Sequence, residues 1–394
     1  MKLRRLRTLG GLLLVLAVSA VGTALVNGSD QHGLVVHEWG TFTSIAGEDG
    51  RAVPWLPLSG PSDLPCFVKR IDLNFKGTLA GKVRMETPVL YFYAPHQVDV
   101  DVTVRFNQGL VTEWFPDAAV APFTVDVAAA SRLGRPGFSS TATWRGVSVA
   151  PDSTASFPDD GRGGHYYVAR RTDATPLRLG STSEKFLFYR GVGGFEPPLS
   201  ATVAVDGSIA VHGSDNTPLG DLMLFENRAG HIAYRLFNST SSRTTFSPLV
   251  LDGESATPQG ELEKVLIAHG LYPIEAKAMV DTWRDSWFEE GSRLFYIVSR
   301  QAIDEILPVK VSPQPSELVR VFVGREELAT PATLRDVGDA LASNDQATLA
   351  KYARFLPAIA AGLPDPANAG EHAGRKAALQ AARQAPVLRP SSCR

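Results

Sequence analysis

Alternating apolar and polar residues dominate the chain between about residues 34 and 250. In the segment 98–106 every second residue is Val or Phe, and the residues between them are Asp, Thr and Arg. Because successive side chains of an extended segment point to opposite faces, this pattern predicts a half-buried β-strand. Asn107, Gln108 and Gly109 supply a turn, and the segment 110–115 is expected to return as the next strand until Pro116 stops it.

Similar short runs recur through the same region. They lie at 89–93, 142–149, 166–170, 186–190, 201–205, 209–212, 222–226 and 232–237. Asp206 and Gly207 separate two of these runs, and both residue types tolerate the positive φ of a type I′ hairpin turn. Many short strands joined by tight turns predict a mainly β fold of the antiparallel, sandwich-like kind.

The period of the pattern changes after about residue 256. The segment 259–269 carries Leu262, Val265 and Leu266 on one helical face, and Gly270 follows it as a typical helix end. Pro273 opens a second predicted helix, because Pro is favoured at the first helical position. The apolar residues at helical spacing in this second helix are Ala276, Met279, Val280, Trp283 and Trp287.

Strands and helices both follow in the C-terminal part. The segments 293–299 and 319–323 are β-rich, whereas Thr330 and the segment 343–345 are N-terminal signals of two closing helices. From Gly362 onward Ala, Gly, Pro and basic residues prevail, which leaves too few large apolar side chains for a core. We therefore expect a β-rich domain at 34–250, a mixed α+β domain at 256–360 and a mobile tail at 362–394.

The N-terminal segment is typical of an exported protein. Lys2, Arg4, Arg5 and Arg7 precede the run 9–26, which carries no charge. Small residues at 18–20 and 22–24 favour cleavage of residues 1–26 as a signal peptide, while the length of the run also allows an uncleaved anchor. Both outcomes predict a periplasmic or extracellular protein, which contacts a membrane only through residues 9–26 if they are retained.

Charge and motif content exclude several classes of partner. The 394 residues include 39 Lys and Arg against 41 Asp and Glu, so there is no excess positive charge to hold a nucleic acid backbone. The sequence contains no phosphate-binding loop and no serine nucleophile elbow, and it indicates no cofactor. Cys66 and Cys393 could pair in an oxidising compartment, which the sequence leaves open.

Acidic and histidine side chains provide the candidates for catalysis. His37 and Glu38 begin the mature region, but in a strand they point to opposite faces and cannot bind one ion together without a bulge. On a helix, three acids and Arg284 share one side near residues 281–289, where they form either an acid and base pair or an ion-paired surface. The candidate catalytic residues are His37, Glu38, His165, Glu196, Asp281, Asp285 and Glu289.

Glycine-rich segments and aromatic residues provide the candidates for ligand binding. Gly161 to Gly164 precede His165, and Gly191 to Gly194 lie between Arg190 and Glu196, so both stretches read as hairpin loops that a ligand can approach. Exposed aromatic rings stack on sugars and peptides, which suggests a glycan or peptide ligand. The candidate ligand-binding residues are Trp39, Trp55, Trp114, Tyr166, Arg190 and Arg284.

Four sequence blocks carry a resemblance to a known family. They are 37–44 (His-Glu-Trp-Gly-Thr-Phe-Thr-Ser), 84–93, 184–191 and 282–291. These blocks resemble those of an uncharacterised family of exported bacterial proteins that has no established activity. The resemblance implies export, and it implies no catalytic residue.

Two functions from different classes fit these features. The favoured one is a ligand-binding or structural protein of the cell envelope. The alternative is a hydrolase or lyase acting on an envelope or extracellular polymer, with or without a metal ion, in which helix carboxylates meet a histidine in a cleft. The sequence indicates neither a set of metal ligands nor a substrate.

Overall fold

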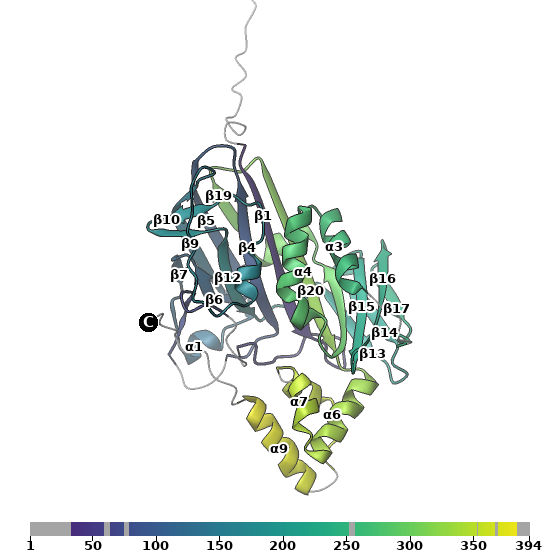
Figure 1. Ribbon diagram of the computed structural model, residues 1–394. Coiled ribbons are helices and arrows are strands. Elements are labelled where there is room, and N and C mark those ends of the chain that lie inside the picture. The colour runs from purple at the N-terminus through teal and green to yellow at the C-terminus, as the bar shows by residue number, and fades with distance from the viewer. Residues whose placement is uncertain are drawn as a thin grey trace, which may run out of the picture.

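The computed structural model describes residues 33–58, 64–74, 79–251, 257–352, 354–366 and 369–383 (Figure 1). The predicted signal segment 1–26 lies outside these ranges, as does Cys393. Cys66 is disulfide-bonded. In the described part of the chain, none of the helices is both long and apolar enough to cross a membrane.

A nine-stranded mixed sheet forms the centre of the molecule. Its strands, in spatial order, are β16 (His231–Ser239), β15 (Gly220–Arg228), β18 (Gly291–Ile297), β20 (Glu317–Leu328), β1 (Val35–Ile45), β4 (Val83–Tyr93), β12 (Leu187–Gly193), β6 (Gly109–Phe115) and β2 (Lys69–Arg70). The central strands β1 and β20 pair in parallel, and the other neighbours are antiparallel. Both are buried along most of their length because layers cover the sheet on each face.

Smaller sheets pack on one face of the large sheet. One contains β11 (Thr182–Glu184), β10 (Leu177–Leu179), β9 (Ser139–Val149), β5 (Val98–Asn107), β19 (Val309–Ser312) and β7 (Ala119–Ala121). Another contains β13 (Leu199–Val203), β14 (Ile209–Gly213) and β17 (Arg243–Phe246), and a third pairs β3 (Asp72–Leu73) with β8 (Thr124–Val125). The core between the layers takes the buried alternate residues of β5 together with apolar residues of β1, β4 and β20.

Helices cover the opposite face of the large sheet. The covering helices are α2 (His165–Val168), α3 (Pro258–Ala268) and α4 (Pro273–Trp287), and Figure 1 shows α3 and α4 side by side in front of the sheet. Met279, Val280, Trp283 and Trp287 of α4 are buried against the sheet, as their spacing predicts. Two more short helices, α1 (Val127–Ala130) and α5 (Arg300–Ile306), and the 3₁₀ turn Ser214–Asn216 join strands elsewhere.

A group of C-terminal helices packs at the end of β1. The group contains α6 (Pro331–Ser343), α7 (Gln346–Lys351), α8 (Leu356–Ala361) and α9 (Ala369–Arg383). Thr330 and Asp345 cap α6 and α7 through their side chains, as the sequence predicts. The helix α9 occupies part of the region expected to be a tail without a core. Its Ala378 and Leu379 pack against the other helices, so a few apolar residues on one face are sufficient here.

The predicted fold class is confirmed: antiparallel sheets dominate, and helices concentrate after residue 258. Strands from both sides of the expected boundary near residue 250 share the large sheet, since β15, β18, β20 and β1 are neighbours in that order. The boundary in the sequence is therefore not a boundary in the sheet.

Two local predictions are wrong. The run 166–170 forms the single helical turn α2 instead of a strand, because Gly164 reverses the chain at φ +120° and Tyr166 then turns inward toward Phe186 and Phe188. The turn at 206–207 is not type I′, since only Gly207 of the two residues has a positive φ. The hydrogen bond from Ala204 N to Ser208 O closes a three-residue loop, in which only the last residue needs that conformation.

Candidate functional site

His37 and Glu38 lie on opposite faces of β1, as the strand pattern predicts. His37 faces the helices and Glu38 faces the smaller sheets. Glu38 is fully buried, where it accepts hydrogen bonds from Arg320 and from the Tyr189 hydroxyl. The two side chains therefore belong to separate polar groups and do not act at one centre.

His37 belongs to a buried group that sequence reasoning did not find. Its Nδ1 lies 2.7 Å from Oε2 of Glu275 on α4, and the Tyr93 hydroxyl donates to the other carboxylate oxygen at 2.7 Å. The Tyr272 ring lies 4.4 Å from the His37 ring and covers it. His37 and Glu275 are at most 1% exposed, so solvent does not reach the pair. No local pattern predicts this pairing because 238 residues separate the partners.

His165 and Asp285 are brought together at the surface. Nε2 of His165 lies 3.6 Å from Oδ2 of Asp285, and the carboxylate side chain is 83% exposed. The His165 ring also contacts Trp283 at 5.9 Å, and the Arg190 guanidinium lies over the same Trp283 ring at 5.8 Å. The structure thus gathers three sequence-predicted candidates around one tryptophan, with His165 and Asp285 too far apart for a direct hydrogen bond.

The remaining acids of the predicted strip do not join this pair. Asp281 forms ion pairs with Lys277 at 2.9 Å and with Arg284 of the same helix. Glu289 is not on α4 at all, because the helix ends at Trp287, and its carboxylate lies 2.7 Å from Arg325. Asp281 therefore belongs to an ion-paired surface, and Glu289 links the end of the helix to β20 of the sheet.

Glu196 and the second glycine-rich stretch have structural roles. Glu196 binds Lys82 and Arg51 at the surface, away from the other candidates. Gly191 to Gly193 lie inside β12 rather than in a loop. A Cβ on Gly191 would lie 2.7 Å from the Leu110 carbonyl oxygen, so the glycine is required for close packing.

Arg190 belongs to a polar cluster on the helix-covered face of the sheet, centred on Glu86. Thr43 donates to Glu86 at 3.0 Å, and Arg354 of the C-terminal helix group donates at 2.6 Å. Arg190 donates to the Thr87 hydroxyl at 3.1 Å, where Thr87 has φ +46°, a conformation rare for a β-branched residue.

The charges of this cluster keep Glu86 ionised. Burial by itself raises the pKa of the Glu86 carboxyl, but the charges of Arg354, Arg325, Arg190 and Arg84 outweigh burial and hold the pKa below its ordinary value. Such a buried network ties β4, β12 and β20 to the C-terminal helices. Among the described residues, no group of three or more His, Cys, Asp or Glu side chains is placed to hold a metal ion.

The aromatic residues expected to stack on a ligand are buried. Trp39 and Tyr166 lie beneath the helices, Trp114 lies between the sheets, and Trp55 packs among the C-terminal helices. None of the four is more than 4% exposed. Their rings fill cores, so in this structure they offer no surface for a sugar or peptide.

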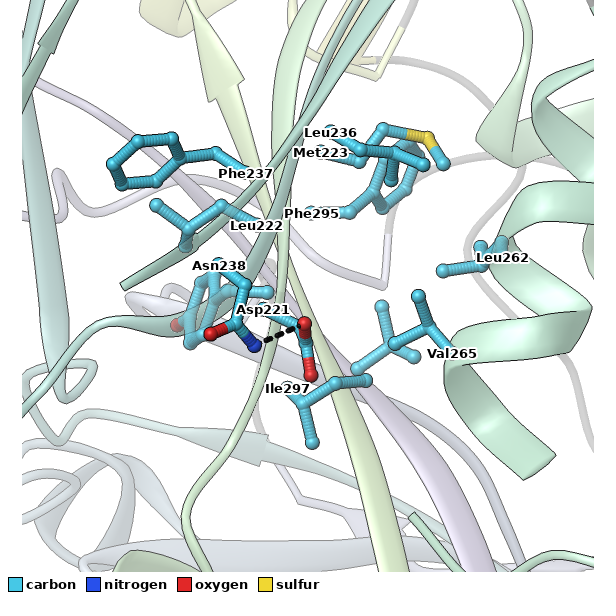
Figure 2. A pocket seen from close by; sticks show the side chains of 12 residues that line it. Asp221, Leu222, Met223, Leu236, Phe237, Asn238, Leu262, Val265, Phe295 and Ile297 are labelled. Carbon is cyan, nitrogen blue, oxygen red and sulfur yellow. Dashed lines mark hydrogen bonds between the residues drawn. The ribbon is translucent and has the colours of Figure 1, made fainter. Parts of the chain in front are cut away.

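A mainly apolar cavity lies between α3 and the large sheet (Figure 2). It has a volume of about 180 Å³. Leu262 and Val265 of α3 face side chains of β15, β16 and β18 across it. The lining residues are Asp221, Leu222, Met223, Leu236, Phe237, Asn238, Leu262, Val265, Phe295, Tyr296, Ile297 and Val323, most of which are apolar.

The polar groups of the cavity gather around Asp221. Asn238 donates to one oxygen of the Asp221 carboxylate at 2.6 Å, and Nε2 of His269 lies 2.8 Å from the other. Burial alone raises the pKa of Asp221, but these two partners lower it below the ordinary value. The carboxylate is therefore negative at neutral pH, and one end of an apolar cavity carries an anionic group.

Sequence reasoning missed this cavity. The apolar positions of α3 and of the strands predict burial, but a pattern along one chain segment does not show whether facing side chains leave a gap. Leu236 lies on a predicted strand and lines the cavity, and the structure shows that its side chain is 39% exposed. Asp221 carried no motif that would have marked it.

Comparison with models of known protein families found no match to this chain, and comparison with curated proteins found none either. The resemblance carried by the four sequence blocks stays a prediction.

Proposed function

We propose that this chain is an exported binding protein that holds an apolar group of a small ligand in the cavity between α3 and the large sheet. The observation that carries the proposal is the cavity lining, which is apolar on both the helix and the strand side and polar only around Asp221. Export is proposed from the basic start and the uncharged run 9–26.

The size and chemistry of the cavity narrow the class of ligand. A dry apolar cavity of about 150 Å³ in another protein binds benzene, so about 180 Å³ has room for one ring or a short acyl segment. A sugar or a peptide would leave its polar groups without partners against such a lining. The anionic Asp221 favours a ligand whose polar end is a hydroxyl or an amine over one that carries a carboxylate or phosphate.

A fluorescent apolar probe tests the proposal. The neutral dye N-phenyl-1-naphthylamine should bind the full-length protein with enhanced emission when its phenyl ring enters the cavity and its naphthyl group stays at the mouth. Val265→Trp should weaken this binding by about tenfold or more because the larger side chain fills the space for the phenyl ring. Ile267→Trp is the matched control, since Ile267 lies on the same helix, is 40% exposed and does not line the cavity. Equal binding by both variants would place the dye elsewhere and refute the proposal.

The enzyme alternative rests on a single observation, the surface pair of His165 and Asp285. We rank it second because neither residue lines the cavity and their side chains lie 3.6 Å apart. Hydrolysis of chromogenic glycoside, ester and peptide substrates that disappears in His165→Ala, with an unchanged unfolding transition, would reverse this ranking.

A further inference from the structure

Apolar side chains are exposed together in the turn between α3 and α4. Ile267 and Tyr272 are each 40% exposed, and Ile274 is 37% exposed. These three lie within eight residues of sequence. Elsewhere in the described chain, exposed Phe123 and Val127 lie within five residues of sequence, exposed Val205 and Val250 line one pocket, and exposed Leu236 lies on β16. A single exposed apolar residue is ordinary, but a group at one tip marks an interaction surface.

The same end of the molecule carries the start of β1. Val35 pairs with Tyr93 in the sheet, and the Tyr93 ring lies 5.0 Å from the ring of Tyr272. The chain therefore enters the fold beside this turn. In the sequence, six residues, 27–32, separate residue 33 from the uncharged run 9–26. A short connection of this kind keeps the turn close to any membrane that holds the run.

The anionic end of the cavity also lies at this end. His269, which contacts Asp221, belongs to the α3–α4 turn itself. Asp221 is the second residue of β15, and β15 has the same direction as β1 through the intervening antiparallel β18 and β20. The exposed apolar group, the entry of the chain and the anionic end of the cavity at Asp221 thus share one end of the molecule.

We propose that the α3–α4 turn rests on a lipid membrane, with Ile267, Tyr272 and Ile274 inserted among the lipid headgroups, and that the cavity ligand reaches its site from that membrane. Isoleucine side chains gain from leaving water, and tyrosine is favoured at the membrane interface because its ring is apolar and its hydroxyl is polar. The route for the ligand rests on the proposed function, whereas the membrane contact rests on the turn alone.

Lipid is favoured over a protein partner as the occupant because of where the chain enters the fold. An apolar patch beside the connection to an apolar segment meets the membrane without any further binding partner. The patch is also small, since three side chains bury far less area than a stable protein interface requires. A second copy of the chain is therefore an outcome that the experiment must separate.

An environment-sensitive fluorophore at the turn tests the proposal. The full chain, expressed with its N-terminal segment in an exporting host, carries a nitrobenzoxadiazole label on Ile274→Cys, with unsubstituted protein as the labelling control. The matched variant is Val205→Cys, since Val205 is 98% exposed but lies near Ser292 and Thr330 at the opposite end of β18 and β20. The label at position 274 should shift to the blue with phosphatidylcholine vesicles and lose intensity when the vesicles carry spin-labelled lipid, and the label at position 205 should do neither.

Charged substitutions give the second measurement. Ile267→Asp combined with Ile274→Asp should weaken vesicle association of the released protein, or lipid quenching of the anchored one, by about tenfold or more. Val205→Asp combined with Val250→Asp should leave both unchanged. Unchanged association in the first pair would overturn the proposal, because the turn would then contribute nothing.

The remaining outcomes separate the two proposals. A blue shift that depends on protein concentration and ignores lipid would assign the turn to a second copy and overturn the membrane contact. Dye binding in the cavity without lipid insertion would overturn the membrane contact and leave the proposed function standing. Lipid insertion without dye binding would support the membrane contact and refute the cavity ligand together with its route.

Discussion

Glu86 shows how a charge is kept inside this protein. Its carboxylate accepts hydrogen bonds from Thr43 and Arg354 and is surrounded by arginines from β4, β12 and β20. A carboxyl whose pKa is lowered on folding stabilises the fold above the ordinary carboxyl pKa. This contribution is lost as the pH falls through the lowered folded value, because the unfolded chain then binds the proton more readily.

Glu86→Gln should therefore destabilise the protein at neutral pH and much less in acid. Removing one partner of a buried ion pair costs about 3 kcal/mol or more in the free energy of unfolding at pH 7. The difference between variant and wild type should shrink as the pH falls below the ordinary glutamate pKa of about 4.3, because protonation of the unfolded chain then removes the advantage of the wild-type carboxylate. Urea unfolding at several pH values measures this, and Glu196→Gln at the surface should change stability by less than about 0.5 kcal/mol.

Glu326 has the opposite character. It is fully buried, and neither carboxylate oxygen has a hydrogen-bond partner in the part of the chain that the structure describes. Burial raises its pKa well above the ordinary value, so the side chain is held neutral in the fold. Below the ordinary carboxyl pKa both the folded and the unfolded chain hold the proton, and Glu326 then costs no stability through ionisation. As the pH rises above that value, the unfolded chain releases the proton while the folded chain keeps it, and the free energy of unfolding falls.

Glu326→Leu should accordingly stabilise the protein at pH 7. Replacing a buried polar group without a partner by an apolar one of similar size removes a cost of about 1–3 kcal/mol. The gain should be smaller at pH 4, because Glu326 of the unfolded wild-type chain is then mostly protonated and its ionisation no longer favours unfolding. Thermal and urea unfolding at both pH values measure the gain. A variant less stable than wild type at pH 7 would contradict the prediction, because it would mean that the carboxyl has a partner in the folded protein.

At the scale of elements, two glycines differ in whether their surroundings leave room for a side chain. Gly191 lies in β12 where an added Cβ would contact the Leu110 carbonyl oxygen at 2.7 Å, whereas nothing lies within 4 Å of a Cβ added to Gly260 in α3. The first position has no room, and the second has no steric reason to be glycine.

Gly191→Ala and Gly260→Ala should consequently change stability in opposite directions. We expect Gly191→Ala to destabilise by about 1–3 kcal/mol through overpacking. Gly260→Ala should stabilise by about 0.5–1 kcal/mol because alanine restricts the unfolded chain and suits a helix. Equilibrium unfolding of the two variants checks both signs, and a loss of stability in Gly260→Ala would mean that the start of α3 needs glycine.

The elements that sequence patterns predict well are those with long, regular periods. The alternation at 98–106 became β5, and the apolar spacing after Pro273 became α4. The prediction for the short run 166–170 is wrong because five residues are too few to distinguish a strand from one helical turn. The helix α9 is not predicted because only two of its apolar residues, Ala378 and Leu379, contact the other helices, and two residues make a weak pattern.

For the whole molecule, the order of strands in the large sheet decides how the chain is divided. β18 and β20 lie between β15 and β1, so the C-terminal part supplies the centre of a sheet begun by the N-terminal part. A fragment ending near residue 250 would leave both β1 and β15 with an unpaired edge.

The fragment 1–251 should therefore fail to fold alone. Expressed by itself in an exporting host, it should be degraded or aggregate, and any soluble material should show no cooperative unfolding transition. Co-expression with the fragment 257–394, fused to the same N-terminal segment 1–32 so that both pieces are exported, should rescue soluble protein that contains both pieces. A stable, cooperatively unfolding fragment 1–251 would contradict this and restore two independent domains.

The sequence by itself determined the period of each segment, and with it the mainly β body, the helices after residue 258 and the opposite directions of His37 and Glu38. These features depend on residues that are neighbours along the chain. Only the tertiary structure decided that His37 meets Glu275, that Arg354 reaches Glu86 and that α3 stands off the sheet to leave a cavity. Each of these joins segments distant in the sequence, and their relative placement follows from packing in the whole fold, which no local pattern records.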